Sequence, residues 1–226
     1  MKRLNLLIIV CTLLFALAQT AQATPLVNGG FETGDFTGWT VILNGGTAQV
    51  VSSHTSIVAP GDPSTVYSPV GGSYFALLKT DGPGNEQKIQ QSFDLVAGQT
   101  IFGWAAFDWG DYAQFYDNAW VRIYKGDPAA FDVPWYESGN PMTPPIPPTP
   151  PIPRPNYWDG PWTKWSYTAP TAGTYTVVMG IENWGDAALP SYALFDDVKV
   201  TPLPGTLLFL FSGLFGLAGF RKKVWG

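Results

Sequence analysis

The sequence predicts an all-β fold, a jelly-roll β-sandwich, from three observations. The chain of 226 residues contains 25 Gly, 21 Pro and 15% aromatic residues, a composition typical of short strands joined by turns. No window between residues 24 and 201 keeps a 3.6-residue apolar period. Short runs of β-branched and aromatic residues alternate with clusters of Gly, Pro, Asn and Asp, which predicts a sandwich. The predicted strands cover 48–52, 74–78, 89–95, 100–107, 119–124, 164–168, 173–181 and 192–200.

A proline-rich segment, residues 141–155, interrupts this rhythm between the strands that contain Trp120 and Trp165. Such a run adopts polyproline II and cannot donate hydrogen bonds into a sheet. We therefore expect an inserted, stiff surface loop. A docking ligand for an aromatic groove is the alternative, although proline content alone names no partner.

The N-terminus has the pattern of a signal peptide, residues 1–23. Lys2 and Arg3 precede an apolar stretch, 6–18, and the small-residue site 21–23 predicts cleavage before Thr24. The only cysteine of the chain, Cys11, lies inside this peptide. The mature domain would have no disulfide, so its core must be stable without one.

The C-terminal tail predicts a single hydrophobic helix. Residues 206–220 are uncharged and apolar, and Arg221, Lys222 and Lys223 follow directly. As a helix the run reaches roughly 22 Å, which only just spans a bilayer core with the help of Leu203 and the basic side-chain stems. The basic cluster favours a cytoplasmic C-terminus. An amphipathic core helix is less favoured, because the run is apolar on all faces.

The tail resembles the PEP-CTERM sorting signal. Pro202, Leu203 and Pro204 match its proline triplet, with Leu where Glu is usual, and 214–223 match its Leu- and Gly-rich helix and basic cluster. The resemblance implies export in a Gram-negative bacterium that makes extracellular polysaccharide. It also implies that the tail is held transiently in the inner membrane, where an exosortase-type enzyme processes it. A sortase signal fits less well, because Leu207 stands where its motif needs Gly.

These features divide the chain into a signal peptide (1–23), a β-sandwich (24–201) and a sorting segment (202–226). All 17 acidic residues lie in the middle part with only seven cations, which gives it a net charge of −10. Such a charge argues against nucleic acid or anionic lipid as a ligand. It is compatible with divalent cations and neutral glycans.

The two ends of the middle part resemble the first and last strands of galactose-binding-domain-like jelly rolls, which include many carbohydrate-binding modules. The matching segments are 26–39, which contains Asn-Gly-Gly-Phe-Glu, and 194–198, which contains Asp-Asp-Val. The resemblance implies a structural calcium ion held by Glu32 with Asp196 or Asp197. We expect Leu194, Asp196, Val198 and Val200 to share an inward face. The alternative is that Asp196 accepts backbone hydrogen bonds and no metal binds.

A second candidate site is the acidic and aromatic stretch 107–118, which carries no family signature. Its carboxylates and rings could stack a sugar and accept its hydroxyl hydrogen bonds, or hold a second cation. The segment 182–186 has the same character and could line the same end. The alternative is a tight loop whose rings cap the sandwich. The predicted ligand-binding residues are Asp108, Trp109, Asp111, Tyr112, Asp117 and Trp184.

The sequence favours a protein that is not an enzyme. The only histidine, His54, lies in a polar turn and is expected to be solvated, and no nucleophile elbow accompanies it. We therefore expect an exported surface or matrix protein that binds or scaffolds extracellular polysaccharide. The alternatives are a glycan-active hydrolase that uses carboxylates such as Asp108 and Asp117, and a purely structural matrix protein.

Overall fold

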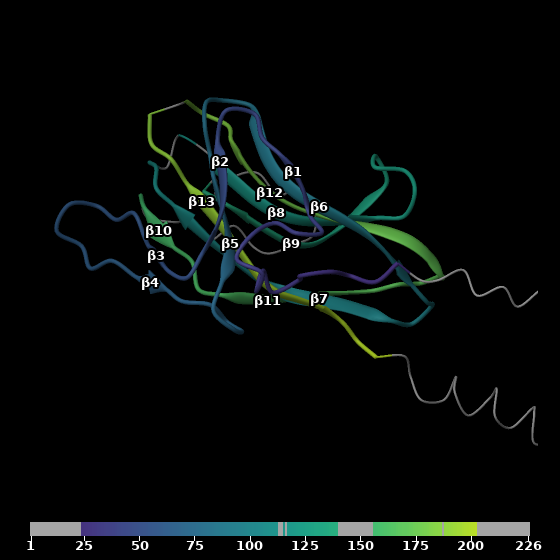
Figure 1. The fold of residues 1–226 in the computed structure, drawn as a ribbon. Coiled ribbons are helices and arrows are strands. Elements are labelled where there is room, and N and C mark those ends of the chain that lie inside the picture. The colour runs from purple at the N-terminus through teal and green to yellow at the C-terminus, as the bar shows by residue number, and fades with distance from the viewer. Residues whose placement is uncertain (1–23, 113–114, 116, 140–155, 187, 203–226) are drawn as a thin grey trace, which may run out of the picture.

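A computed structural model describes residues 24–112, 115, 117–139, 156–186 and 188–202. These residues form thirteen strands and no helix, arranged as two packed antiparallel sheets with a small ribbon (Figure 1). The predicted fold class, an all-β sandwich, is confirmed. The predicted signal peptide, the proline-rich insert and the tail from Leu203 onward lie outside the described residues.

The first sheet has five strands, and its centre is built from the longest ones. β12 pairs with β6 on one side and with β8 on the other, and Asn183 lies opposite both Asn85 and Asp117. The order across the sheet is β1 (Thr40–Ile42), β6 (Asn85–Leu95), β12 (Gly173–Asn183), β8 (Asp117–Tyr124) and β9 (Phe131–Ser138).

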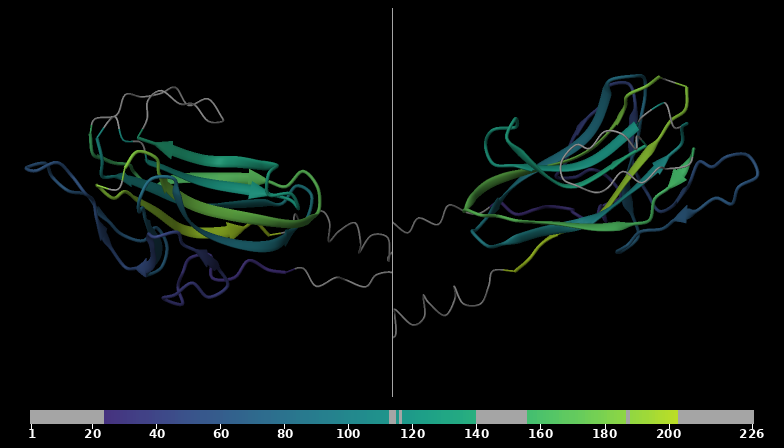
Figure 2. Two further views of the ribbon diagram at one scale, coloured as in Figure 1. Left: turned by 90° about the horizontal axis from the view of Figure 1, so that it is seen from above. Right: turned by 180° about the vertical axis from the view of Figure 1, so that it is seen from behind.

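The second sheet is organised around β7 (Thr100–Trp109), whose outer edge pairs with two strands, β10 (Trp158–Asp159) and β11 (Thr163–Thr168). On its other side follow β13 (Tyr192–Val200), β5 (Phe75–Lys79) and β2 (Thr47–Val51). The ribbon pairs β3 (His54–Thr55) with β4 (Val66–Tyr67), and the loop between them projects from the sandwich (Figures 1 and 2).

The side chains of the second sheet enter two separate apolar clusters. The main core lies between the sheets and contains fully buried Phe93, Phe107 and Phe195. A smaller cluster contains Tyr67 of the ribbon and Leu194, with Trp162 packed against it. Neighbours in one strand point to opposite faces, so the second sheet is covered on both sides near the ribbon. Each fully buried Phe contributes about 1.5–3 kcal/mol.

Each of the eight predicted segments overlaps one strand, but β9 and the short strands β1, β3, β4 and β10 were not predicted. Pro134 lies in its middle, and proline usually argues against a strand because it has no N–H to donate. β9 accommodates it at the edge of its sheet, where the pairing with β8 shifts register between Val121 and Ile123. An edge strand with an irregularity is where a sheet tolerates proline.

The predicted common face of the last strand is wrong. β13 has a register shift between Asp196 and Lys199, and Asp197 has a positive φ of 53°. This bulge reverses the alternation, so Leu194 packs in the smaller cluster whereas Val198 packs in the main core.

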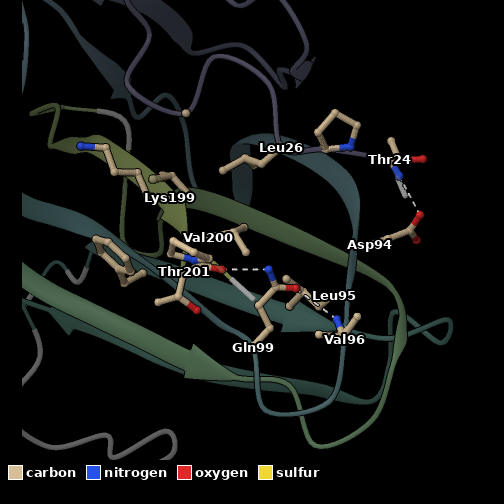
Figure 3. A pocket seen from close by; sticks show the side chains of 14 residues that line it. Thr24, Leu26, Asp94, Leu95, Val96, Gln99, Lys199, Val200 and Thr201 are labelled. Atoms are coloured by element: carbon tan, nitrogen blue, oxygen red, sulfur yellow. Dashed lines mark hydrogen bonds between the residues drawn. The ribbon is translucent and has the colours of Figure 1, made fainter. Parts of the chain in front are cut away.

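Both ends of the described chain leave on one side of the sandwich (Figures 1 and 2). The backbone N–H of Thr24 donates to Asp94 Oδ2 at 2.8 Å, and Gln99 Nε2 donates to the carbonyl of Thr201 at 2.8 Å. A mostly apolar groove of roughly 700 Å³ lies between these ends, with Leu26 and Val200 in its lining (Figure 3). Within the described residues, no helix is long and apolar enough to cross a membrane.

Candidate functional site

The structure separates Asp108 and Trp109 from the other predicted ligand residues. We expected a loop from Asp108 onward, but β7 continues to Trp109. Consecutive strand residues point to opposite faces, and both side chains are fully buried. The Trp109 ring lies in the main core, so it offers no stacking surface to a ligand.

Asp108 lies on the ribbon side of the second sheet and pairs with His54. The distance from His54 Nε2 to Asp108 Oδ2 is 2.7 Å, and the backbone N–H of Ile57 donates to the same carboxylate at 3.2 Å. The His54 ring packs against that of Tyr192, with centroids 4.5 Å apart. Burial is the main cause that raises the pKa of Asp108, and His54 opposes the rise.

The expectation that His54 is solvated is therefore wrong, because only 11% of its side chain is exposed. Its partner is 54 positions away in the sequence, and no local pattern around residues 51–56 reveals such a contact. The pair fastens the ribbon to the second sheet.

Three acidic residues lie near the end of the sandwich where β7 stops and β8 begins, close enough for their charges to interact. Asp111 lies two residues beyond β7, and Asp117 is the first residue of β8. Asp186 follows β12, in a turn where Asn183 Oδ1 accepts the N–H groups of Gly185 and Asp186. The negative charge of Asp186 raises the pKa of both Asp111 and Asp117.

The Asp117 side chain has no exposed surface, and neither of its carboxylate oxygens has a hydrogen-bond partner. Asp111 is 1% exposed; its Oδ1 accepts the N–H of Tyr112, but its Oδ2 has no partner. Burial is the main cause that raises the pKa of Asp117 to about 7. The Ser191 hydroxyl, whose Oγ accepts the N–H of Gly110 at 3.0 Å, and the backbone N–H of Trp184 both face Asp117 and oppose this rise.

Exposed aromatic rings lie on the same loops as these carboxylates. Trp184 is 65% exposed and Tyr112 is 44% exposed. The Tyr112 ring meets the Tyr157 ring edge to face at 5.4 Å. Gly185 lies so close to Phe115 that an added Cβ would be 2.9 Å from the Phe115 Cα, so the loops of Tyr112 and Trp184 are neighbours. This end of the molecule combines exposed rings with buried acidic groups.

The predicted calcium ligands surround one short segment, residues 70–74. Asp196 is fully buried and accepts three backbone N–H groups, from Val70 at 2.7 Å, Gly71 at 3.1 Å and Asp197 at 2.6 Å. Burial raises its pKa to about 6. Glu32 accepts N–H groups from Ser73 and Tyr74 at 2.9–3.0 Å.

The third predicted ligand, Asp197, forms an ion pair with Lys199. The surroundings of these carboxylates therefore supply donors, whereas calcium requires six to eight oxygen ligands. In the described part of the chain, no group of three or more His, Cys, Asp or Glu side chains is arranged to hold a metal. The Asp196 contacts are those of the metal-free alternative, and calcium binding there stays a prediction.

No protein-family model matches the chain, and a search of curated proteins finds no match. Among solved structures, the chain is similar to the carbohydrate-binding module TmCBM61, solved with β-1,4-galactotriose. The identity is 16% over 80% of this chain and 99% of that one, with a TM-score of 0.45. A family 16 carbohydrate-binding module-2 gives 15% identity over 78% of this chain and 99% of that one, with a TM-score of 0.42.

An enzymatically active domain of tailspike protein 4 from bacteriophage CBA120 is similar as well. The identity is 11% over 80% of this chain and 21% of that one, with a TM-score of 0.40. Similarities of this size describe a shared kind of β architecture and carry no argument about a ligand or an activity. The function must therefore be argued from the residues of this chain.

Proposed function

We propose that this protein binds neutral glycan, without enzymatic activity, through the end of the sandwich that carries Tyr112 and Trp184. The observation that carries the proposal is the exposure of these two rings beside buried carboxylates. A sugar ring presents C–H faces that stack on aromatic side chains. Its hydroxyl groups can donate to the half-buried Asp186 on the Trp184 loop, whereas Asp111 and Asp117 are too buried for a sugar to reach. The net charge of −10 between residues 24 and 201 disfavours anionic polysaccharides.

The test is retention of the purified full chain on neutral polysaccharides in affinity electrophoresis. We expect Trp184→Ala to weaken retention about tenfold or more, because a central Trp commonly dominates a binding surface. Tyr74→Ala is the matched control, since Tyr74 is also exposed (37%) but precedes β5, away from this end. Equal retention of the wild type and Trp184→Ala would exclude this surface as the binding site.

The hydrolase alternative predicts that the same polysaccharides release reducing ends when they are incubated with the protein. Asp108 and Asp117, the carboxylates first considered, have different neighbours: Asp108 interacts with His54, and Asp117 with Asp111 and Asp186. A pair that flanks one glycosidic bond must face a common substrate. Released reducing ends that disappear in Asp111→Asn or Asp117→Asn would replace the binding proposal with a hydrolase.

We also propose that the protein is exported and sorted by an exosortase-type enzyme, with the mature form at the cell surface or in the polysaccharide matrix. The residues that support this are the signal-peptide pattern of 1–23 and the tail motif of Pro202, Leu203, Pro204, Arg221, Lys222 and Lys223. Mass spectrometry of the envelope protein should give Thr24 as its first residue and an end near 202–204. A mature protein that keeps residues 206–226 would instead have a permanent anchor.

A further inference from the structure

We propose that Asp111 and Asp117 bind a divalent cation, calcium by the chemistry of their oxygens, at the end of the sandwich. This site is distinct from the calcium site predicted at Glu32, Asp196 and Asp197. It goes beyond glycan binding, because a cation can bind there with no sugar present.

Three buried carboxylate oxygens at this end of the sandwich have no hydrogen-bond partner. Both oxygens of Asp117 and Oδ2 of Asp111 lack a hydrogen bond, although the two residues are 0% and 1% exposed. Native proteins satisfy nearly all buried polar groups, and an unpaired buried carboxylate costs several kcal/mol. Three such oxygens on neighbouring residues therefore indicate a missing partner of positive charge.

Among the described residues, no cationic side chain supplies this charge. None of the ion pairs between described residues joins Asp111, Asp117 or Asp186. Asp186 follows Gly185, which packs against Phe115 of the β7–β8 connection, so it adds a further negative charge at this end. A bound cation would offset these charges.

The donor set indicates which cation binds. Carboxylate oxygens are hard ligands, and calcium accepts them singly or in pairs within a flexible shell of six to eight. Because no group of three or more acidic or histidine side chains among the described residues is arranged to hold a metal, Asp111 and Asp117 would be the only carboxylate ligands, and backbone carbonyls and water would complete the shell. Magnesium demands a strict octahedron and keeps its water more firmly, so calcium suits this set better.

A cation at this place would connect the two ends of the β7–β8 hairpin. Asp111 follows β7, Asp117 starts β8, and Asn183 of β12 lies opposite Asp117 in the first sheet. The hairpin and the neighbouring loop carry the exposed rings of Tyr112 and Trp184. The cation would therefore fix the position of these rings and reduce the entropy lost when a ligand binds.

The test uses the purified full chain after removal of metal with EDTA. Calcium is titrated by calorimetry to obtain the stoichiometry, and thermal unfolding is followed with and without 1 mM calcium, on the order of the weakest extracellular calcium sites. We expect calcium to raise the Tm of the wild type by several degrees. Asp117→Asn and Asp111→Asn should each lose one bound ion and reduce the shift, while circular dichroism confirms that they fold.

Glu32→Gln is the matched control, because it changes the other predicted site. If the ion and the Tm shift survive in both Asp117→Asn and Asp111→Asn, or if the wild type shows neither, the proposed site does not exist. Glycan retention in EDTA is measured separately. Calcium binding without glycan retention would refute only the glycan proposal, and retention without any bound calcium would refute only the cation site.

Discussion

Two groups of acidic residues in this molecule are buried in different ways. Around residues 70–74, Asp196 accepts three backbone N–H groups and Glu32 accepts two. At the end of the sandwich, Asp117 is equally buried but neither of its oxygens is hydrogen-bonded. The sequence marks both groups as candidate cation sites, yet only the second lacks partners within the described protein.

This difference shows what a buried carboxylate needs. The N–H groups around Asp196 replace the water that it loses on folding, so the protein itself completes the site. Asp117 loses the same water and accepts no complete hydrogen bond, although the Ser191 hydroxyl and the Trp184 N–H face it. A partner from outside therefore contributes most to folding at Asp117 and least at Asp196.

The largest expected effect comes from Asp196→Ala. The substitution leaves the N–H groups of Val70, Gly71 and Asp197 without their acceptor, and each buried donor costs about 1–3 kcal/mol. Because two of the three lie in a surface loop that water can reach, we expect a total loss of about 2–4 kcal/mol. Urea denaturation measures it, with the exposed Asp62→Ala as the control. A loss no larger than that of the control would remove the distinction between the two groups.

The next effect is the pH dependence of the calcium-free protein. Folding raises the pKa of Asp117 to about 7 and that of Asp196 to about 6, mainly through burial. A raised pKa means that the folded state binds the proton more tightly, so stability is lost as pH rises through these values. We expect unfolding in EDTA to require about 1–2 kcal/mol less at pH 8 than at pH 5.5.

Further acidification should reverse this trend. The contacts of Glu86 with Lys88 and Arg122 lower the pKa of Glu86 despite its burial, so its contribution is lost as pH falls through that lowered value. Thermal unfolding between pH 3 and 8 measures both the loss of stability at rising pH and the loss on acidification. A flat profile between pH 5.5 and 8 would show that Asp117 and Asp196 are not buried as anions.

Asp117→Asn should change the free energy of unfolding by a smaller amount than Asp196→Ala, and it should raise this free energy rather than lower it. In EDTA at pH 8 the amide avoids the cost of a buried charge, so we expect a gain of about 1 kcal/mol in the free energy of unfolding. With calcium the wild type should become more stable than the variant, because only the wild type binds the cation. Thermal unfolding of both proteins in the two buffers measures this, and destabilisation of the variant in EDTA would contradict it.

Glu32→Gln should lower the free energy of unfolding least, by less than about 1 kcal/mol. The amide oxygen of Gln can still accept the N–H groups of Ser73 and Tyr74, although more weakly than a carboxylate. Urea denaturation in EDTA provides the value. A loss as large as that of Asp196→Ala would mean that the Glu32 charge, and not only its acceptor geometry, holds residues 70–74.

Most of the fold could be predicted from the sequence, because strand periodicity and turn residues are local signals. The eight predicted segments overlap β2, β5, β6, β7, β8, β11, β12 and β13, whereas the short strands β1, β3, β4 and β10 were missed. β9 was missed because Pro134 is tolerated at an edge that the sequence does not reveal. The face of Val198 was missed because one bulge in β13 reverses the alternation.

The candidate site could be predicted only in part. The spacing of Asp111, Tyr112 and Asp117 with Trp184 predicted one acidic and aromatic end, and the structure brings their loops together. Asp108 was assigned to the same group because β7 was expected to stop two residues early. Its pairing with His54 depends on where the ribbon folds back, which composition and spacing do not contain.

The direction of β13 sets the distance between the proposed binding end and the point where the chain leaves the sandwich. The strand starts at Tyr192, next to the Ser191 that faces Asp117, and ends at Val200, beside the groove where the chain leaves the sandwich. Nine extended residues cover about 30 Å. If the tail is held in a membrane and β13 stands upright on it, the strand acts as a rigid spacer that places the rings of Tyr112 and Trp184 up to about 30 Å farther from the lipid than the attachment point.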